Sequence, residues 1–449
     1  MKVIKFQNAD YDLCILGGGP AGMSSALAGI RAGQRVLLID QGINNGDYLH
    51  VNGLVDISNN VGGILGIGNV WGAQITFPTA RDIEHFLEAS NHSIVKKYYK
   101  GINTIASLLN IEIENFNRVK EFDSNFSSLD TGVFSSTYSV YLPHVSLLNY
   151  FKEVTDSPNF KYAQGTIQSL NIDEKMQLNS INCDFGTLNI STAKTVIALG
   201  ALESCRILLK SLPNIEKSLI LDHPQGYIGQ LTGKGVSALK DQDLFYFNNY
   251  RFRRKFLFRV ENREGIVELH ANLSLDKELF RNDPKLFFKR IINRILNKFD
   301  FKFVFVPDEF KVWVQIDQVP NISSFLEIKN GDLIESWSVG DSDVDFVLEI
   351  IEALKDLASK LNLEFTAESS KHLRSKERCF NLSHAHHPSS TLFLQDKSEN
   401  TFMRMGKLSE TSNFAIAGSA ILPASGWINP TLLIMGMAFS ITDELLHTT

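Results

Sequence analysis

Short apolar runs separated by turn residues mark the N-terminal part of the chain. Residues 11–16 are apolar and lead into glycines, residues 21–32 are rich in small side chains, and residues 35–39 are apolar again. A strand, a glycine turn, a helix and a second strand in this order predict a β-α-β unit. Residues 194–199 (KTVIAL) form another apolar run, which predicts a buried strand leading through Gly200 into a helix.

The middle of the chain has a different periodicity. Residues 230–275 and 301–328 alternate apolar and polar side chains, as strands of an antiparallel sheet with one buried face do. Residues 342–361 repeat apolar side chains at helical spacing, which predicts an amphipathic helix. We therefore expect an α/β fold of mixed α+β type, in which a Rossmann-like domain is joined to a second domain built on an antiparallel sheet.

The turn after the first strand has the sequence GGGPAG over residues 17–22. In a dinucleotide-binding unit, Gly17 allows the tight turn, Gly19 lets a pyrophosphate approach the backbone, and Gly22 lets the helix pack on its strand. Asp40 ends the second strand, where an acid can accept hydrogen bonds from ribose hydroxyls. This order of elements predicts a dinucleotide site, and a purely structural glycine turn is the alternative.

Composition excludes several classes of protein. The 449 residues include 50 acidic and 44 basic side chains, a net charge of −6 that disfavours nucleic acid as a partner. The four cysteines are scattered without a C-x-x-C pair, so neither a metal site nor a dithiol redox site is predicted. The first residues are polar rather than a secretory signal, and no run of about 20 apolar residues occurs. We expect a cytoplasmic protein.

Five motifs occur together in a fixed order. They are GGGPAG at 17–22, VIALGALESCRILL at 196–209, Asp-His-Pro at 222–224, HPSST at 387–391 and IAGSAILPASGWINPTLLIMGMA at 416–438. In this order the chain resembles the glucose–methanol–choline (GMC) oxidoreductases, and most closely their bacterial branch related to pyranose and sugar-alcohol oxidoreductases. The resemblance covers most of the chain and implies FAD as the cofactor.

The resemblance also implies which residues bind FAD. Some relatives attach the flavin through a His that precedes a loop Trp; here that position is Val70, so FAD is expected to bind non-covalently. The expected cofactor-binding residues are Gly17, Gly19, Pro20, Ala21, Gly22, Asp40, Gln41, Trp71, Gly72, Gly200, Gly418, Ser419, Asn429, Pro430 and Thr431.

Two residues near the C-terminus are the expected catalytic pair. Alcohol oxidation needs an acceptor for the hydroxyl proton, and a neutral His can take that proton near pH 7. It also needs a polar group that orients the hydroxyl, so that the hydride moves to flavin N5. The family motifs place the base on His387, with His386 as the alternative, and the orienting group on Asn429. For Asn429 a helix cap is the alternative. The Asp-His-Pro motif at 222–224 is interpreted as a turn between the domains, with a metal or catalytic site as the alternative.

The resemblance implies a discontinuous domain organisation. Residues 1–80, 141–230 and 375–449 are expected to form the FAD-binding domain, and residues 81–140 and 231–374 the substrate-binding domain. The expected reaction oxidises an alcohol group of a sugar or sugar-derived substrate. The alternatives are a sterol- or lipid-alcohol oxidase and an FAD-binding protein of the same fold without alcohol oxidation.

Two segments combine basic and aromatic residues against the acidic average. They are residues 250–260 (YRFRRKFLFRV) and residues 285–299 (KLFFKRIINRILNKF). In the second, five apolar side chains fall on one helical face: Phe288, Ile291, Ile292, Ile295 and Phe299. This face can pack on the antiparallel sheet, or both segments can contact a membrane surface or a lipid-linked substrate. Besides this contact, we expect a small-molecule or glycan substrate as the partner.

Overall fold

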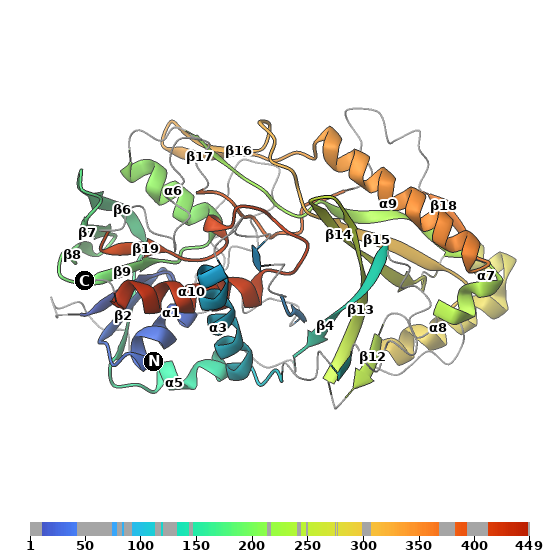
Figure 1. The fold of residues 1–449 in the computed structure, drawn as a ribbon, viewed down its shortest axis with the longest axis horizontal. Helices are drawn as coiled ribbons and strands as arrows, with labels where there is room; N and C mark the ends of the chain where they lie inside the picture. The colour runs from blue at the N-terminus through green and yellow to red at the C-terminus, as the bar shows by residue number, and fades with distance from the viewer. Residues whose placement is uncertain are drawn as a thin grey trace.

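The fold joins a parallel-sheet part and an antiparallel-sheet part (Figure 1). In Figure 1 the parallel sheet lies on the left and the large antiparallel sheet on the right, and both ends of the chain belong to the left part. The computed structural model describes residues 11–42, 74–78, 83–84, 92–112, 118–119, 133–142, 147–212, 217–239, 244–247, 250–273, 275, 277–298, 307–367, 382–392 and 412–447.

The parallel sheet has five strands in the order β19-β9-β1-β2-β5. The predicted β-α-β unit is confirmed, because α1 (Pro20–Arg31) connects the neighbouring parallel strands β1 and β2. β1, β2 and β19 are buried along their whole length, as strands covered on both faces must be. The five strands are β1 (Leu13–Leu16), β2 (Val36–Asp40), β5 (Phe160–Gln164), β9 (Lys194–Ile197) and β19 (Phe414–Ile416).

Helices from distant parts of the chain pack beside this sheet. α10 (Thr431–His447) contacts both α1 and α3 (His92–Leu108). Gly101 and Gly436 allow the crossing of α3 and α10, since a Cβ on Gly436 would lie 2.5 Å from the Cα of Ile102. The N-terminal and C-terminal segments of the chain therefore share one core.

The large antiparallel sheet confirms the prediction from alternating residues. Its order is β18-β11-β15-β14-β13-β4-β3, with β12 paired to β13. One face packs on α9 (Asp341–Lys360) through side chains such as Phe256, Val267 and Val347. The strands are β3 (Gln74–Thr76), β4 (Phe134–Tyr141), β11 (Gln225–Thr232), β12 (Leu244–Phe247), β13 (Tyr250–Val260), β14 (Arg263–Ala271), β15 (Phe310–Ile316) and β18 (Glu364–Ala367).

The domain boundaries stay a prediction. In the segment assigned to 81–140, α3 packs on α10 of the parallel part, whereas β4 belongs to the antiparallel sheet. The remaining elements are α5 (Lys152–Thr155), β6 (Ile167–Ile172), β7 (Leu178–Cys183), β8 (Gly186–Asn189), α6 (Ala201–Ser211), β10 (Lys217–Leu219), α7 (Lys277–Asn282), α8 (Pro284–Lys298), β16 (Phe325–Lys329), β17 (Asp332–Ser336) and the short 3-10 helices Leu147–Phe151, Lys234–Leu239 and Ser419–Ile421.

The part of the chain that the structure describes also contains two sheets of three strands, in the orders β10-β16-β17 and β6-β7-β8. Among the described residues no helix combines the length and the apolar character needed to cross a membrane. The mixed α/β fold class predicted from the sequence is confirmed by this architecture.

Candidate functional site

The carboxyl ends of three parallel strands bring the predicted glycine turns together. In register, Leu16 of β1 lies beside Ile197 of β9, which lies beside Ile416 of β19. Each strand is followed within a few residues by a glycine with positive φ: Gly17 (98°), Gly200 (82°) and Gly418 (112°). Ligands of open α/β sheets bind outside this edge.

Two glycines of the first turn are required by close packing. A Cβ on Gly17 would lie 2.4 Å from the carbonyl oxygen of Ala198, and a Cβ on Gly22 would lie 1.9 Å from the carbonyl oxygen of Gly17. A Cβ on Gly19 would meet nothing within 4 Å. The turn is therefore tight against β9 and α1 but open at Gly19, where the sequence predicts the approach of a pyrophosphate.

The start of α1 presents backbone donors at this open position. Gly19 is the N-cap of α1, and Pro20 is the first helical residue. No side chain caps this end of the helix with a hydrogen bond. The first turn of a helix has N–H groups without partners inside the helix. Asp40 lies close by, and its two carboxylate oxygens accept hydrogen bonds from the backbone N–H groups of Gly18 (2.8 Å) and Gly42 (2.9 Å).

The other predicted cofactor residues follow the same edge. A Cβ on Gly418 would lie 3.8 Å from the Cβ of Ala21, so the last strand approaches the start of α1. The carbonyl of Gln41 accepts a hydrogen bond from Gln164 (3.2 Å), and that of Ser419 accepts the N–H of Ser390 (3.1 Å). Trp71 and Gly72, together with Val70, lie outside the described residues.

The loop that carries His387 crosses from the antiparallel part to this edge. Its start pairs with β11 through a bridge between Ser383 and Gln225, and its end is bound at the edge. There, Leu392 N–H donates to the carbonyl of Ala420 (3.0 Å), and the Thr391 hydroxyl donates to the carbonyl of Ala201 (2.7 Å). The HPSST motif thus lies between the two sheets.

Asp222 fixes the backbone of this loop. The residue is buried, and its carboxylate accepts the N–H groups of His223 (2.6 Å), Ala385 (3.0 Å) and His387 (2.9 Å). His386 and Ser390, on either side of His387, have positive φ values of 59° and 61°. Such backbone is uncommon for residues other than glycine and persists where the surroundings impose it.

His223 connects the His387 loop to the loop that carries Asn429. The two imidazole rings of His223 and His387 meet edge to face, with centroids 5.3 Å apart. His223 Nδ1 lies 2.6 Å from the carbonyl oxygen of Gly426. A carbonyl only accepts, so Nδ1 carries the proton and Nε2 holds the lone pair. Within the described residues, neither His223 Nε2 nor His387 Nδ1 has a hydrogen-bond partner.

Asn429 lies two residues before α10. Its side-chain amide donates a long hydrogen bond of 3.4 Å to Gln74 Oε1 on β3, while the carbonyl of Pro430 accepts the N–H of Ile434 (2.8 Å) in the first helical turn. Gln74 Nε2 and Trp427 Nε1 are buried and have no partner among the described residues. Unpaired buried donors are costly, so the free Nε2 of Gln74, on the side chain that contacts Asn429, is a donor that a polar ligand can satisfy.

The imidazoles of the site are held neutral. Removal from water, followed by the proximity of His223, His386 and Lys255, lowers the pKa of His387 to about 3. Burial likewise lowers the pKa of His223 to about 4. Both rings are therefore unprotonated near neutral pH, when each has one nitrogen able to accept a proton.

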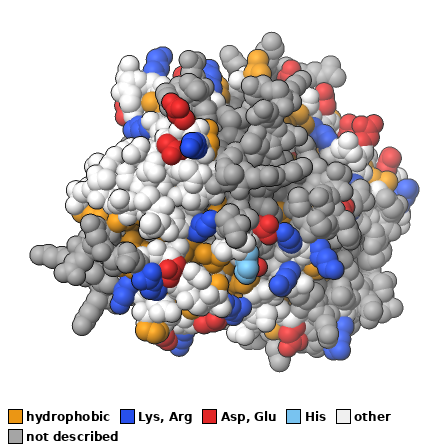
Figure 2. All heavy atoms as spheres, turned by 60° about the vertical axis from the view of Figure 1, so that its left-hand side comes forward, with side chains coloured by type: hydrophobic (Ala, Val, Ile, Leu, Met, Phe, Trp, Pro, Cys, Tyr) orange, Lys and Arg blue, Asp and Glu red, His pale blue; other side chains and the backbone are white. Residues whose placement is uncertain are grey.

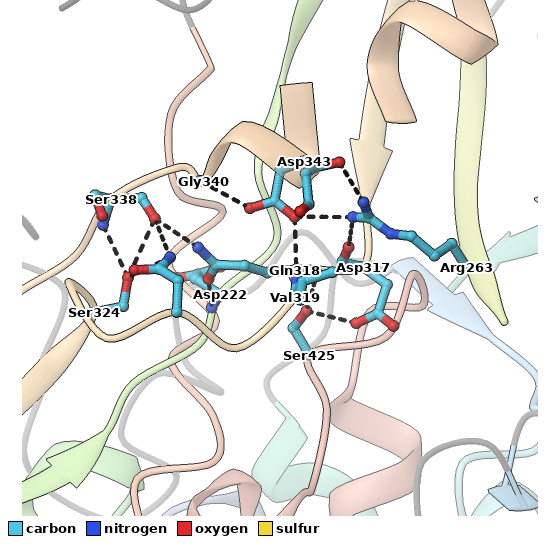
Figure 3. A network of polar contacts seen from close by, with 12 residues as sticks. Asp222, Arg263, Asp317, Gln318, Val319, Ser324, Ser338, Gly340, Asp343 and Ser425 are labelled. Carbon is cyan, nitrogen blue, oxygen red and sulfur yellow. Dashed lines mark hydrogen bonds and ion pairs between the residues drawn. The ribbon is translucent and has the colours of Figure 1, made fainter. Parts of the chain in front are cut away.

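A second polar network, around Asp317 and Gln318 after β15, holds the segments that carry the site (Figure 3). The amide of Gln318 accepts the N–H of Asp222 (3.0 Å), and its own backbone N–H donates to Ser425 Oγ (2.9 Å). Asp317 accepts both the Ser425 hydroxyl (2.9 Å) and the N–H of Gly426 (2.8 Å). The loops before His387 and Asn429 are thus anchored to the same end of β15.

Sequence reasoning missed the roles of Asp222 and His223. The segment 221–224 does connect β10 to β11, as the reading of a turn between domains requires. Both side chains, however, are buried, and both act on the His387 loop or its ring. The signal available in the sequence was an acid and a His placed directly after the apolar run at 219–221.

Known proteins resemble this chain in structure but not in sequence. No family model matches the chain, and no curated protein matches it. Pyridoxine 4-oxidase from Mesorbium loti is similar in structure, with a TM-score of 0.62 and 13% identity over 97% of this chain and 99% of that one. A fungal aryl-alcohol oxidase aligns with a TM-score of 0.57 and 12% identity, over 98% and 99% of the two chains. This chain therefore has the fold of these two oxidases.

Proposed function

We propose that the protein is an FAD-dependent oxidoreductase that oxidises an alcohol to a carbonyl compound. The observation that carries this proposal is the placement of His387. Its imidazole is neutral, and one end of its loop is bound to the carboxyl edge of the parallel sheet. His223 contacts the His387 ring and hydrogen-bonds Gly426 in the loop that carries Asn429, so it joins the two loops. The resemblance to GMC oxidoreductases and the shared fold with two oxidases support the same reaction.

The carboxyl edge fits a dinucleotide. Gly19 leaves open space at a helix N-terminus, and Asp40 ends the second strand with its carboxylate beside the turn. Gly200 and Gly418 bring two further turns to the same edge. These residues would hold FAD non-covalently, and bound FAD supplies an acceptor for the hydride of the alcohol.

His387 is suited to take the hydroxyl proton. A group that accepts a proton must be unprotonated before the reaction, and the lowered pKa of His387 ensures this at neutral pH. Asp222 holds the His387 backbone, and the edge-to-face contact with the His223 ring restricts the His387 imidazole. His386, the alternative base, is exposed and adopts a positive φ, so its ring lies farther into solvent.

Asn429 is suited to orient the hydroxyl. Its amide is within 3.4 Å of Gln74, whose own Nε2 is unpaired among the described residues. Two neighbouring side-chain amides offer donors and acceptors to one polar ligand. Orientation of a reacting group in this way contributes to rate through proximity.

A sugar-derived alcohol is the substrate class that the sheet face favours. Gln315 on β15 donates a hydrogen bond to the carbonyl of Trp427 (2.9 Å), so the face of the antiparallel sheet that carries Gln315 and Trp313 is the one near the site. On that side, Glu268 pairs with Lys255 (2.9 Å) and contacts His270 (3.0 Å), whose ring stacks on Trp313. Charged groups beside an aromatic surface suit a polar ring better than a sterol.

Anaerobic reduction of the purified yellow protein by a panel of sugars, sugar alcohols, aryl alcohols and sterols tests the reaction. We expect loss of the oxidised flavin absorbance with one class, and a decrease in the reduction rate of about 100-fold or more in His387→Ala. His386→Asn is the matched control, because Asn tolerates positive φ, and should reduce at the normal rate. Flavin that no alcohol reduces would refute the proposal.

A further inference from the structure

α7 and α8, whose ribbons lie on the right of Figure 1, carry a cluster of exposed large apolar side chains. Phe280 on α7 is 49% exposed, and on α8 Phe288, Ile292 and Ile295 are 56%, 41% and 51% exposed. We call these four residues the α7–α8 patch. Isolated exposed apolar residues are ordinary, but a contiguous group marks a site of interaction.

The orientation of α8 is fixed with its apolar side outward. Arg290 and Asn293 are buried, at 7% and 2% exposure. The guanidinium of Arg290 pairs with Asp308 (2.7 Å) beyond the helix. Successive helical residues are rotated by about 100°, so Arg290 and Asn293 lie roughly opposite Ile292 and Ile295. The helix therefore packs on the protein through its polar side.

Phe287, which is not part of the patch, contacts both aromatic rings of the patch. Phe280 and Phe287 meet edge to face at 5.1 Å between centroids, and Phe287 and Phe288 at 6.0 Å. This contact joins α7 to α8 and makes the four exposed side chains one surface rather than two. Because these side chains are already ordered, little conformational entropy is lost when the surface binds a partner.

Basic side chains border the patch on both sides. Residues 277–298 contain seven basic and two acidic residues, in a chain with a net charge of −6. The exposed side chains of Lys285 and Lys289 lie on one flank of the stripe and that of Arg294 on the other. In contrast, the described surface in Figure 2 has basic and acidic side chains interspersed.

We propose that the α7–α8 patch docks on the surface of a membrane that contains anionic lipid. An apolar stripe bordered by cations is the arrangement by which a helix lies in the lipid interface, with rings and branched chains among the acyl groups and Lys or Arg at the phosphates. A second copy of this chain fits less well, because a two-fold contact would bring the basic flanks together. The proposal is independent of the proposed reaction.

Co-sedimentation of the full chain with vesicles tests the docking. We expect binding to phosphatidylcholine vesicles that contain phosphatidylglycerol, weak binding to pure phosphatidylcholine, and weakening by salt. The double variant Ile292→Glu/Ile295→Glu removes two apolar anchors and should raise the apparent Kd by about 100-fold or more. Lys285→Glu/Arg294→Glu should raise it at least about tenfold for the anionic vesicles.

Ile322→Glu is the matched control, since Ile322 is 89% exposed in a turn away from the patch. This variant should bind as the unaltered chain does, and circular dichroism should show that all variants fold. Absence of binding to anionic vesicles would overturn the proposal, as would equal binding by Ile292→Glu/Ile295→Glu. An unaltered chain that dimerises without binding vesicles, and that Ile292→Glu/Ile295→Glu makes monomeric, would assign the patch to self-association instead.

Discussion

The carboxylate of Asp222 accepts the backbone N–H of His387 at 2.9 Å, and a second N–H of the same loop, from Ala385, at 3.0 Å. Asp222 and His387 are 165 positions apart in the sequence. One buried acid therefore determines where the candidate base lies, although it does not touch the imidazole.

Asp222→Asn is expected to displace the loop without removing the base. An amide offers one acceptor oxygen, and its NH₂ group would oppose an N–H donor of the loop. Loss of one charge-assisted hydrogen bond costs about 1.5–3 kcal/mol, so the rate of flavin reduction should fall about 10- to 100-fold. Stopped-flow reduction measures this rate. Flavin content should be unchanged, and an unchanged reduction rate would contradict the role of Asp222.

The pH dependence of kcat/KM should reflect Asp222 rather than His387. Burial raises the pKa of Asp222 to about 7, against the lowering by its three backbone hydrogen bonds. As the pH falls through this value the carboxylate gains a proton and loses acceptor capacity, so kcat/KM should fall. His387, with a pKa lowered to about 3, stays neutral and adds no limb there. We expect a limb near pH 7 in the unaltered protein and none in Asp222→Asn; an identical limb in both would exclude this assignment.

Glu335→Gln is expected to stabilise the protein at alkaline pH. Glu335 is buried, and its carboxylate oxygens have no partner among the described residues. Burial and then the charge of Asp222 raise the pKa of Glu335 from 4.5 to about 7. The unfolded chain ionises at the lower value, so the free energy of unfolding decreases as the pH rises from 4.5 to about 7 and is constant above.

Gln imitates the protonated carboxyl at every pH. The variant should therefore match the unaltered protein near pH 4 and exceed its free energy of unfolding by about 3 kcal/mol at pH 8. Urea denaturation at the two pH values measures the difference. A variant that is less stable at both would show that Glu335 has an ionic partner in solution.

Gly19→Ala and Gly22→Ala should separate binding from folding. A Cβ at Gly22 would lie 1.9 Å from the carbonyl oxygen of Gly17, so this change should cost about 1–3 kcal/mol of stability. Gly19 has φ −65°, which Ala adopts readily, and free space at its Cβ position. Gly19→Ala should keep the Tm of the flavin-free protein and weaken FAD binding. Thermal unfolding and flavin titration distinguish the two effects. Normal FAD affinity in Gly19→Ala would show that the pyrophosphate does not bind at this turn.

The glycine turn could be predicted because its determinants are local. Strand, turn, helix and acid follow one another between residues 13 and 40, and each is recognisable from its neighbours in the sequence. The alternation in β13, β14 and β15 likewise reports burial on one face of a sheet. Such patterns need no knowledge of the rest of the fold.

Asp222 and α8 could not be predicted in the same way. The hydrogen bonds of Asp222 to the His387 loop depend on a bridge between Leu221 and Ser389, which only the tertiary structure provides. The apolar stripe of α8 was compatible with packing on the sheet, but the ion pair of Arg290 with Asp308 turns that stripe outward. In both cases the orientation of the segment depends on a contact with a residue distant in the sequence, which the local pattern does not reveal.

The position of β19 has a consequence for biosynthesis. This strand is the edge of the parallel sheet, and it is followed directly by Gly418 and then by the Asn429 loop and α10. A nascent chain that ends before residue 412 already contains the glycine turn, β9 and the His387 loop, but it lacks the strand that covers β9. The carboxyl edge of the sheet is therefore complete only after β19 and the Asn429 loop have been synthesised, and until then the exposed edge of β9 is a surface that a chaperone would need to shield.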